Sequence, residues 1–431
     1  MRLPGRLSAA IAVLADTEAR RRPASESLKD WGNSNRFAGA GDRAAIGNLV
    51  YDALRRKASH AWRMGTDSPR ALVLAVAIQD WNETPEAINA AGEGDRFAPE
   101  PISAEEAARA QAPDGLDGAP DWVRADVPEW TAASLERAFG SDWATEAQAF
   151  TERPPLDLRV NRLKSSRDKV LKALSRFEPE ATAIVPDGVR MPAGRRDSRT
   201  PNVQADEGYI KGWFEVQDAG SQIVSVLAGA QPGEQVLDLC AGAGGKTLAM
   251  AAGMNNKGQI FAYDSERPRL APIYDRLKRN GVRNAQVRPP DNGALDDLAG
   301  RMDLVLVDAP CTGTGTWRRR PDTKWKLSAE QLALRVKQQA EILDQAADFV
   351  RPGGALAYIT CSVLPEENDE QIARFLAVHP DFSVEDGAAL WSRHFAGHAD
   401  AALVTPLRGI MLTPRRTGTD GFYCARLVRG R

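Results

Sequence analysis

Five short apolar runs in the carboxyl half of this 431-residue chain constrain its fold more than any other feature. The runs read QVLDLC from residue 235, GQIFAYD from 258, NAQVRP from 284, MDLVLVDAP from 302 and GALAYITCS from 354. Helical segments separate them, and apolar runs of this kind are typical of parallel strands that are buried on both faces. The pattern therefore predicts an α/β fold with a doubly wound, mostly parallel sheet over residues 216–431.

A small α+β domain is expected in front of this sheet, over residues 146–215. PPLDLRVNRLK (154–164) has the pattern of a strand, and SSRDKVLKALSRF (165–177) that of a helix opened by serine. A short strand and a turn follow in ATAIVPDGVRMP (181–192). Strands and helices mixed in this way indicate a separate α+β unit.

Residues 1–145 are expected to form a helical domain. Asp42 can cap a helix, and the apolar side chains that follow it recur on one helical face. That face consists of Ile46, Leu49, Val50, Ala53 and Leu54. Residues 91–120 are rich in Ala, Pro, Gly and acids, which predicts a long loop or insertion.

Composition is that of a globular protein, but charge is distributed unevenly. Apolar residues make up 43% of the chain, and no apolar run reaches the roughly 20 residues of a membrane span, so a cytoplasmic protein with no membrane partner is expected. Residues 1–63 carry 12 Lys and Arg against 6 Asp and Glu, and residues 64–130 carry 4 against 14. A balance of +6 followed by −10 fits a basic face for a polyanion and also fits solvated helix surfaces.

A glycine-rich turn, VLDLCAGAGGKT (236–247), follows the first apolar run directly. Its GKT ending suggests a P-loop, but Cys240 occupies a position where that motif needs glycine, and Thr247 breaks the dinucleotide fingerprint. What remains is a loop whose backbone approaches a ligand at a helix N-terminus. Asp264 ends the next apolar run, where an acid can accept hydrogen bonds from ribose hydroxyls. Together they favour a nucleoside-containing cofactor, S-adenosyl-L-methionine rather than NAD or ATP, over a purely structural turn.

Cys311 and Cys361 each stand just past the carboxyl end of a predicted strand, the edge at which open α/β sheets bind ligands. A single buried cysteine is more often a packing residue, but two at equivalent strand ends beside a cofactor loop favour catalysis. A thiolate that adds to carbon 6 of cytosine makes carbon 5 nucleophilic towards a sulfonium methyl group. The pair therefore indicates methylation at carbon 5 rather than at an exocyclic amine, which requires no covalent step.

Four motifs resemble those of the Nop/Sun (RsmB-like) family of RNA 5-methylcytosine methyltransferases. They are VQDAGSQ (216–222), VLDLCAGAGGKT (236–247), DAPCTGTGTWRRRPD (308–322) and YITCSVLPEEND (358–369). The resemblance covers residues 150–431 and implies a Rossmann-like class I methyltransferase fold with a seven-stranded sheet. It also implies that Cys361 is the nucleophile and that Cys311 assists breakdown of the covalent adduct. The implied substrate is structured RNA, with 16S ribosomal RNA as the first choice and transfer RNA as the nearest alternative.

The same resemblance implies a site for S-adenosyl-L-methionine. Asp264 is implied to bind the ribose, Asp291 to lie by the adenine, and Asp308 to lie between cofactor and cytosine. The loop residues implied to hold the methionine and adenosine parts are Cys240, Ala241, Gly242, Ala243, Gly244, Gly245 and Lys246. Ala243 departs from the family pattern AAPGGKT, which has proline at this position.

RNA contacts are expected at two places. The RsmB-like branch carries an N-terminal helical domain similar to the RNA-binding NusB antitermination factor, and the helical pattern of residues 1–145 is compatible with one. The basic segment 318–326, flanked by Trp317 and containing Trp325, is expected to neutralise RNA phosphates and stack on bases. The alternative for this segment is a solvated loop with its tryptophans half in the core.

Several alternatives stay open. A non-catalytic RNA-binding factor for ribosome assembly or antitermination is the rival function, which the intact cysteine pair disfavours. Glu366 or Glu367 can serve as the base that removes the carbon 5 proton, although helix capping is the favoured interpretation. Cys424 is expected in a core strand. The cysteines and histidines fall at no metal-ligand spacing, so no metal is expected, and the resemblance favours a monomer.

Overall fold

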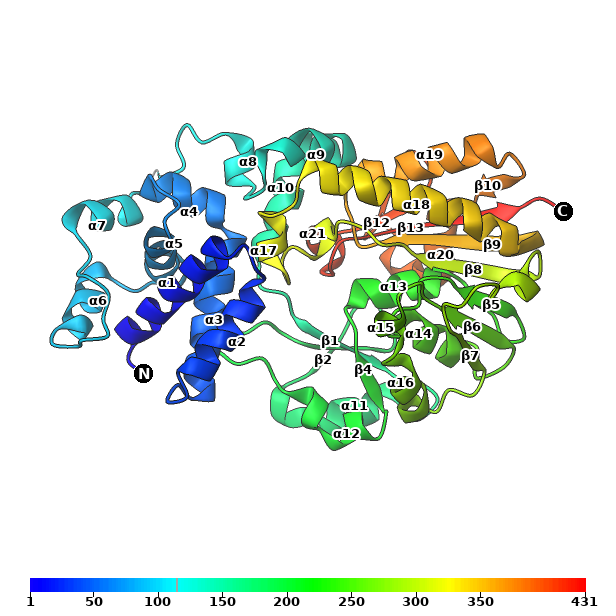
Figure 1. Cartoon of the computed structure of the whole chain (residues 1–431), viewed down its shortest axis with the longest axis horizontal. Helices are drawn as coiled ribbons and strands as arrows, with labels where there is room; N and C mark the ends of the chain where they lie inside the picture. Colours follow the sequence, from blue (N-terminus) through cyan, green and yellow to red (C-terminus); the bar gives the residue numbers. More distant parts are fainter. Residues whose placement is uncertain (114) are drawn as a thin grey trace. The chain divides into compact units, whose positions relative to one another are not determined.

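A computed structural model describes residues 1–113 and 115–431 of the chain (Figure 1). These residues form two compact units, each made of non-contiguous segments. Unit 1 comprises residues 1–154, 193–201 and 317–327, and unit 2 comprises residues 155–192, 202–316 and 328–431. Two short segments from later in the chain are therefore part of the same unit as the first 154 residues.

The regular elements in the described part of unit 1 are helices. The longer ones are α1 (Leu3–Ala19), α2 (Ala24–Ser34), α3 (Ala40–Arg55), α4 (Lys57–Met64), α5 (Pro69–Ala75), α6 (Pro85–Gly92), α7 (Ala104–Gln111), α9 (Ala132–Phe139) and α10 (Trp143–Gln148). α8 (Asp121–Arg124) and α17 (Pro321–Lys324) are single turns. The predicted apolar face of α3 lies entirely in the core of this unit, as the sequence pattern predicts.

Helix starts in unit 1 differ from the predictions in two places. Gly39, not Asp42, is the N-cap of α3, and Asp42 accepts a hydrogen bond from the Gly39 N–H at 3.3 Å. The prediction of a loop over residues 91–120 is wrong for residues 104–111, which form α7. This helix begins with a capping box between Ser103 and Glu106. The Ser-x-x-Glu spacing is a helix-start signal that the Ala- and Pro-rich composition concealed. Residue 114 of that predicted loop lies outside the described residues.

Unit 2 contains a small antiparallel sheet that confirms the strand and helix predicted after residue 150. Its strands run in the order β2 (Glu180–Ala181), β3 (Gly188–Met191), β1 (Leu156–Val160) and β4 (Phe214–Val216). The helix α11 (Arg167–Ala173) follows β1, and α12 (Glu207–Ile210) precedes β4. Leu158, Val170 and Phe214 belong to one buried cluster, so this sheet and α11 have a core of their own.

The large sheet of unit 2 has the predicted doubly wound form. The parallel strands β7 (Ala285–Arg288), β6 (Gln259–Tyr263), β5 (Gln235–Asp238), β8 (Met302–Asp308) and β9 (Val350–Thr360) lie side by side in that order. β13 (Phe422–Arg429) pairs antiparallel with β9 and carries β12 (Ile410–Leu412) on its other side. These seven strands form the Rossmann-like sheet that the sequence predicts. Two short strands, β10 (Phe382–Val384) and β11 (Leu403–Val404), extend it to nine strands in the described residues.

Helices pack on this sheet as the alternating pattern requires. α13 (Ala219–Leu227) contacts α14 (Gly245–Gly253) and β13, while α18 (Ala329–Phe349) contacts β8, β9 and α19 (Asp369–Val378). α15 (Arg267–Leu270) and α16 (Ile273–Asn280) connect β6 to β7, and α20 (Gly387–Phe395) and α21 (Pro414–Thr417) lie nearer the end of the chain. The carboxyl ends of β5, β6, β8 and β9 therefore meet at one edge, where the predicted site residues follow them.

Candidate functional site

The two predicted catalytic cysteines lie together at this edge of the sheet. β8 ends at Asp308 and β9 at Thr360, and the strands are parallel neighbours with Asp308 opposite Ile359. Cys311 and Cys361 follow these ends, and their sulfur atoms are 3.3 Å apart. Both thiols are free, and this separation suits an S–H···S hydrogen bond, since a disulfide bond is about 2.05 Å long.

The surroundings of Cys311 favour its protonated form. Its hydrogen bond with Cys361 raises the Cys311 pKa well above the ordinary value, and burial and the negative charge of Glu367 act in the same direction. Cys311 therefore keeps its proton at neutral pH. Either sulfur can be the donor in the hydrogen bond between them.

Glu367 is fully buried and fixes the loop that carries Cys311. It lies in a 3₁₀ turn (Pro365–Glu367) after β9. Its Oε1 accepts hydrogen bonds from the Thr312 N–H at 2.8 Å and from Gln339 Nε2 at 2.9 Å, and its Oε2 accepts one from Thr312 Oγ1 at 2.5 Å. Gln339 also donates to the Pro310 carbonyl at 2.9 Å. Glu367 and Gln339 thus form a clamp on residues 310–312.

The sequence analysis named Glu367 but not its role in this clamp, and it did not name Gln339. Glu367 was expected to cap a helix or to act as a base, whereas both of its oxygens hold the Cys311 loop. Gln339 gave no signal at all, because one glutamine inside the 21-residue helix α18 looks like any other polar helix position. Its partners, Pro310 and Glu367, are 28 or more residues away along the chain.

A second set of hydrogen bonds joins the loops after β8 and β9. The Thr314 and Ser362 hydroxyl oxygens are 2.9 Å apart, and Thr314 Oγ1 accepts from the Val363 N–H at 2.9 Å. The Gly315 N–H donates to the Cys361 carbonyl, also at 2.9 Å. The backbone from Cys361 to Val363 is therefore fixed to the loop that bears Cys311.

The glycine loop between β5 and α14 adopts a conformation that its sequence explains. Gly242 and Gly244 have φ angles of +49° and +84°, in the left-handed region that favours glycine. A Cβ atom on Gly244 would lie 2.5 Å from Ile273 Cγ1 of α16. Asp264, buried at the end of β6, accepts hydrogen bonds from the N–H groups of Gly242 and Glu266 at 2.9 Å each. Asp264 thus orders the loop it was expected to face.

Lys246 links this loop to the strand that leads to Cys311. Its buried ammonium group lies 2.5 Å from Asp308 Oδ2. Beside it, Asp238 Oδ2 accepts a hydrogen bond from Thr247 Oγ1 at 2.6 Å. Burial raises the pKa of Asp238 to about 7, and its Oδ1 has no hydrogen-bond partner among the described residues. A buried acceptor without a partner at the N-terminus of α14 fits a polar ligand group.

Of the other predicted cofactor residues, Cys240, Ala241 and Ala243 are in the loop, and Asp291 follows β7. The Ala241 N–H donates to the Tyr263 carbonyl at 2.8 Å, and the Ala243 carbonyl accepts from Arg276 Nη1 at 2.7 Å. Burial raises the pKa of the Cys240 thiol, so this thiol stays protonated and is no nucleophile. Asp291 is exposed and pairs with Arg267 at 2.7 Å. The donors and acceptors of this edge fit an S-adenosyl-L-methionine molecule.

The basic segment after Cys311 is largely internal, and this corrects the expected RNA contacts. Trp317, Arg318 and Lys324 are buried. Lys324 Nζ donates to the Arg55 carbonyl at 2.8 Å, and Trp325 Nε1 to the Leu54 carbonyl at 2.6 Å. The prediction that these three buried side chains contact RNA is therefore wrong. Long cationic side chains can pack their apolar stems inside a protein and donate hydrogen bonds from the charged end to backbone carbonyls. Arg320 and Lys326 are exposed.

The fourth cysteine lies in the core of the large sheet. Cys424 is buried in β13 opposite Ile359, which confirms a core strand position. Among residues 1–113 and 115–431, no group of three or more His, Cys, Asp or Glu side chains could hold a metal ion. No helix in the same residues is long and apolar enough to cross a membrane.

Two family models match the chain. The first, described as 16S rRNA methyltransferase RsmB/F, matches residues 225–428. The second, described as an RsmF/B-like ferredoxin-like domain, matches residues 127–195. The first match includes the cysteine pair, and the second includes three strands of the small antiparallel sheet, β1, β2 and β3.

Curated relatives at 36 to 37% identity carry the name ribosomal RNA small subunit methyltransferase B. The protein from Klebsiella pneumoniae is 37% identical over 309 residues, and the one from an Enterobacter species is 36% identical over 306 residues. Each match covers 70% of this chain and 66% of the relative, so the chain spans slightly less than two thirds of the relatives' length.

Solved structures agree on the fold. A protein called PH0851 has a TM-score of 0.71 with 24% identity and 99% of each chain covered. A methyltransferase homologue from Pyrococcus horikoshii has a TM-score of 0.58 with 26% identity, covering 74% of this chain and 99% of the other. NSun6 from Pyrococcus horikoshii, solved with the S-adenosylmethionine analogue SFG, has a TM-score of 0.60 with 20% identity, covering 70% of this chain and 98% of the other.

Proposed function

The chain belongs to the RsmB/F methyltransferase family, and from this premise we propose that it transfers a methyl group from S-adenosyl-L-methionine to carbon 5 of a cytosine in 16S ribosomal RNA. The names of the curated relatives support the small-subunit RNA as substrate. One observation carries the chemistry: two free thiols, 3.3 Å apart, follow the ends of neighbouring parallel strands. A methyltransferase that acts on an exocyclic amine has no use for such a pair.

In the proposed reaction Cys361 is the nucleophile. Its sulfur forms a bond to carbon 6 of the cytosine, and the electron pair of the 5,6 double bond becomes available at carbon 5. S-adenosyl-L-methionine, when bound, would supply an electrophilic methyl group, which carbon 5 would take up as the methyl–sulfonium bond breaks and S-adenosyl-L-homocysteine is left. Transfer of the carbon 5 proton to a base would then expel the Cys361 sulfur as a thiolate and restore the aromatic ring. Cys311, which holds its proton beside Cys361, is placed to assist the departure of that sulfur.

The remaining residues of the edge are proposed to bind and orient. The loop 240–246 would hold the methionine and adenosine parts of the cofactor, with Asp264 on the ribose and Asp291 by the adenine. Asp308 would lie between cofactor and cytosine, and the Lys246 ion pair would keep its carboxylate in place. The division into three domains stays a prediction: a NusB-like domain over 1–145, a small domain over 146–215 and the methyltransferase domain over 216–431. The monomeric state and the cytoplasmic location also stay predictions.

Two cysteine variants test the proposal. Wild type, Cys361→Ala and Cys311→Ala are incubated with labelled S-adenosyl-L-methionine and with 16S ribosomal RNA or transfer RNA that lacks 5-methylcytosine. We expect Cys311→Ala to accumulate a protein–RNA adduct that survives a denaturing gel, and Cys361→Ala to form no adduct and to transfer no methyl group. Cys424→Ala, in a core strand of the same sheet, is the control and should behave like wild type.

Other results would decide against parts of the proposal. Methyl transfer by Cys361→Ala would mean that Cys361 is not the nucleophile. If the wild type methylates transfer RNA and not 16S ribosomal RNA, the substrate is transfer RNA. If the wild type transfers no methyl group to either RNA, the non-catalytic RNA-binding factor becomes the favoured function.

A further inference from the structure

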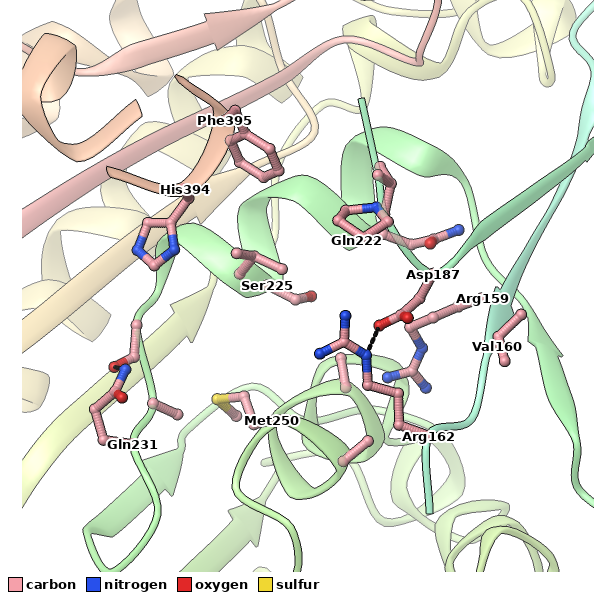
Figure 2. A pocket seen from close by; sticks show the side chains of 18 residues that line it. Arg159, Val160, Arg162, Asp187, Gln222, Ser225, Gln231, Met250, His394 and Phe395 are labelled. Atoms are coloured by element: carbon pink, nitrogen blue, oxygen red, sulfur yellow. Dashed lines mark hydrogen bonds and ion pairs between the residues drawn. The ribbon is translucent and has the colours of Figure 1, made fainter. Parts of the chain in front are cut away.

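A pocket of about 250 Å³ lies in unit 2, and neither cysteine of the pair is among the residues that line it (Figure 2). Its wall includes residues 229–231, which precede β5, and residues 249, 250, 252 and 253, at the carboxyl end of α14. The cofactor loop, by contrast, lies at the carboxyl end of β5 and the amino end of α14. The pocket is therefore separate from the proposed methyl-transfer site.

Arg159 of β1 lines this pocket with hydrogen-bond donors that nothing satisfies. The residue is 7% exposed, and its Nε and Nη1 are buried without a hydrogen-bond partner among the described residues. Its cross-strand neighbour Glu215 already accepts from Arg276, Arg279 and Asn280. Burial lowers the pKa of Arg159 to about 10, so the guanidinium is still charged at neutral pH. Buried donors of this kind normally have acceptors.

Gln222 of α13 presents the complementary group. It is 2% exposed, and its Nε2 donates to the Gln217 carbonyl at 2.8 Å. Its Oε1 is buried and has no partner in the described part of the chain. Arg159 and Gln222 therefore bring two unpartnered donors and one unpartnered acceptor to the wall of the pocket.

The charged side chains that line the pocket are Arg159, Arg162 and Asp187, which sum to +1. Arg162 Nε pairs with Asp187 Oδ2 at 2.5 Å, and Figure 2 shows this pair beside the Arg159 guanidinium. Burial lowers the pKa of His394, which is therefore neutral at pH 7. Figure 2 shows His394 and Phe395 on the other side of the view from the two arginines, and Met250 also lines the pocket. One side of the pocket is thus cationic and the other mostly apolar.

We propose that this pocket binds a single nucleotide, with its phosphate on Arg159 and its base on the apolar side. At pH 7 the phosphate of a nucleotide carries one negative charge as a diester and nearly two as a monoester, so either form is attracted to a cationic pocket, and guanidinium groups bind phosphate oxygens well. The exocyclic amino groups of adenine, cytosine and guanine can donate to Gln222 Oε1. The nucleotide comes either from an RNA chain or from solution, and only the first source depends on the proposed function.

Calorimetry with AMP, CMP, GMP and UMP tests the proposal on the full chain. We expect at least one of them to bind, and Arg159→Met to weaken that binding about tenfold or more. Gln222→Met should weaken the binding of AMP, CMP and GMP, which carry an exocyclic amino group, and leave the binding of UMP unchanged. The matched control is Arg283→Met, since Arg283 is exposed and lies outside the pocket. Thermal unfolding of every variant shows whether it is folded.

Competition with RNA identifies the source of the nucleotide. If it belongs to the RNA substrate, the mononucleotide competes with RNA, and Arg159→Met raises KM for RNA at unchanged kcat. If it comes from solution, neither effect is seen while mononucleotide binding persists. Absence of binding by all four mononucleotides, or equal binding by folded Arg159→Met and wild type, would overturn the proposal. Neither failure affects the Cys361 adduct, so the proposed function is tested separately.

Discussion

At the scale of single residues, the Cys311 loop depends on Glu367, a buried acid that only accepts hydrogen bonds from Thr312 and Gln339. Glu367→Gln places an NH2 group against these donors, so the loop loses at least one hydrogen bond. We expect single-turnover methyl transfer to fall about tenfold or more. The variant also removes a negative charge that contributes to the raised Cys311 pKa, so Cys311 should react faster with iodoacetamide at pH 8.

Peptide mass spectrometry after timed alkylation measures this reactivity for each cysteine separately. Glu341→Gln on the exposed face of α18 is the control, and neither its rate of methyl transfer nor its alkylation pattern should change. An unaltered Cys311 alkylation rate in Glu367→Gln, together with wild-type transfer, would show that the clamp does not matter for the site.

His60 in unit 1 makes stability depend on pH. Burial lowers its pKa from 6.5 to about 3, so the folded chain keeps this imidazole neutral while the unfolded chain protonates it below pH 6.5. The contribution of His60 to stability is therefore lost progressively as pH falls from 6.5 towards 3, by about 1.4 kcal/mol per pH unit. Asp80, 3.5 Å from His60, acts in the opposite direction, because its pKa is raised to about 6 and the folded state takes up its proton first.

The variant His60→Gln isolates this effect. We expect the free energy of unfolding of the variant, relative to wild type, to rise by roughly 1.4 kcal/mol for each pH unit below 6.5. Urea unfolding of both chains at pH 7.5 and 5.5 measures the difference, and Asp80 is present in both. A difference that does not change between the two pH values would mean that His60 is protonated in the folded state.

At the scale of elements, the cofactor loop depends on a close approach between its glycines and α16. Gly244 has a φ angle of +84°, and a Cβ atom added to it would lie 2.5 Å from Ile273 Cγ1. Gly245 is the first residue of α14, and the nearest atom to a Cβ added there is 3.8 Å away. Gly244→Ala should therefore lower the free energy of unfolding by about 1–3 kcal/mol and weaken S-adenosyl-L-methionine binding. The matched variant Gly245→Ala should keep the melting temperature of wild type. Differential scanning calorimetry, with and without the cofactor, compares them, and equal destabilisation by both would contradict this account.

The same scale shows what the sequence can predict. The strands that end at Asp238, Tyr263, Asp308 and Thr360 follow from apolar runs and turn residues, and the parallel order then brings Cys311 and Cys361 to one edge. Local patterns could not reveal Gln339, because its role depends on partners that are distant in sequence. The basic segment was misassigned for a related reason: charge composition does not show whether Lys324 faces solvent or a backbone carbonyl inside the protein.

At the scale of the whole molecule, the two compact units are not consecutive stretches of the chain. Unit 1 includes residues 193–201 and 317–327 in addition to the first 154 residues. Arg55 Nε donates to the Arg318 carbonyl at 2.8 Å, and the Arg55 and Leu54 carbonyls accept from Lys324 and Trp325. Segment 317–327, which directly follows the Cys311 loop in sequence, thus has its hydrogen-bond partners in helix α3.

A chain that starts at residue 155 tests this organisation. It retains Lys324 and Trp325 but lacks Leu54, Arg55 and the cluster in which Trp325 packs, so a buried ammonium and an indole N–H lose their acceptors. We expect the fragment to bind a hydrophobic dye such as ANS and to melt at a lower temperature than the full chain. Replacing Lys324 and Trp325 by serine in the fragment should reduce dye binding, because the exposed segment then no longer carries an apolar ring. If the unmodified fragment melts cooperatively at the temperature of the full chain and binds no dye, segment 317–327 does not require unit 1, and the catalytic part is an independent folding unit.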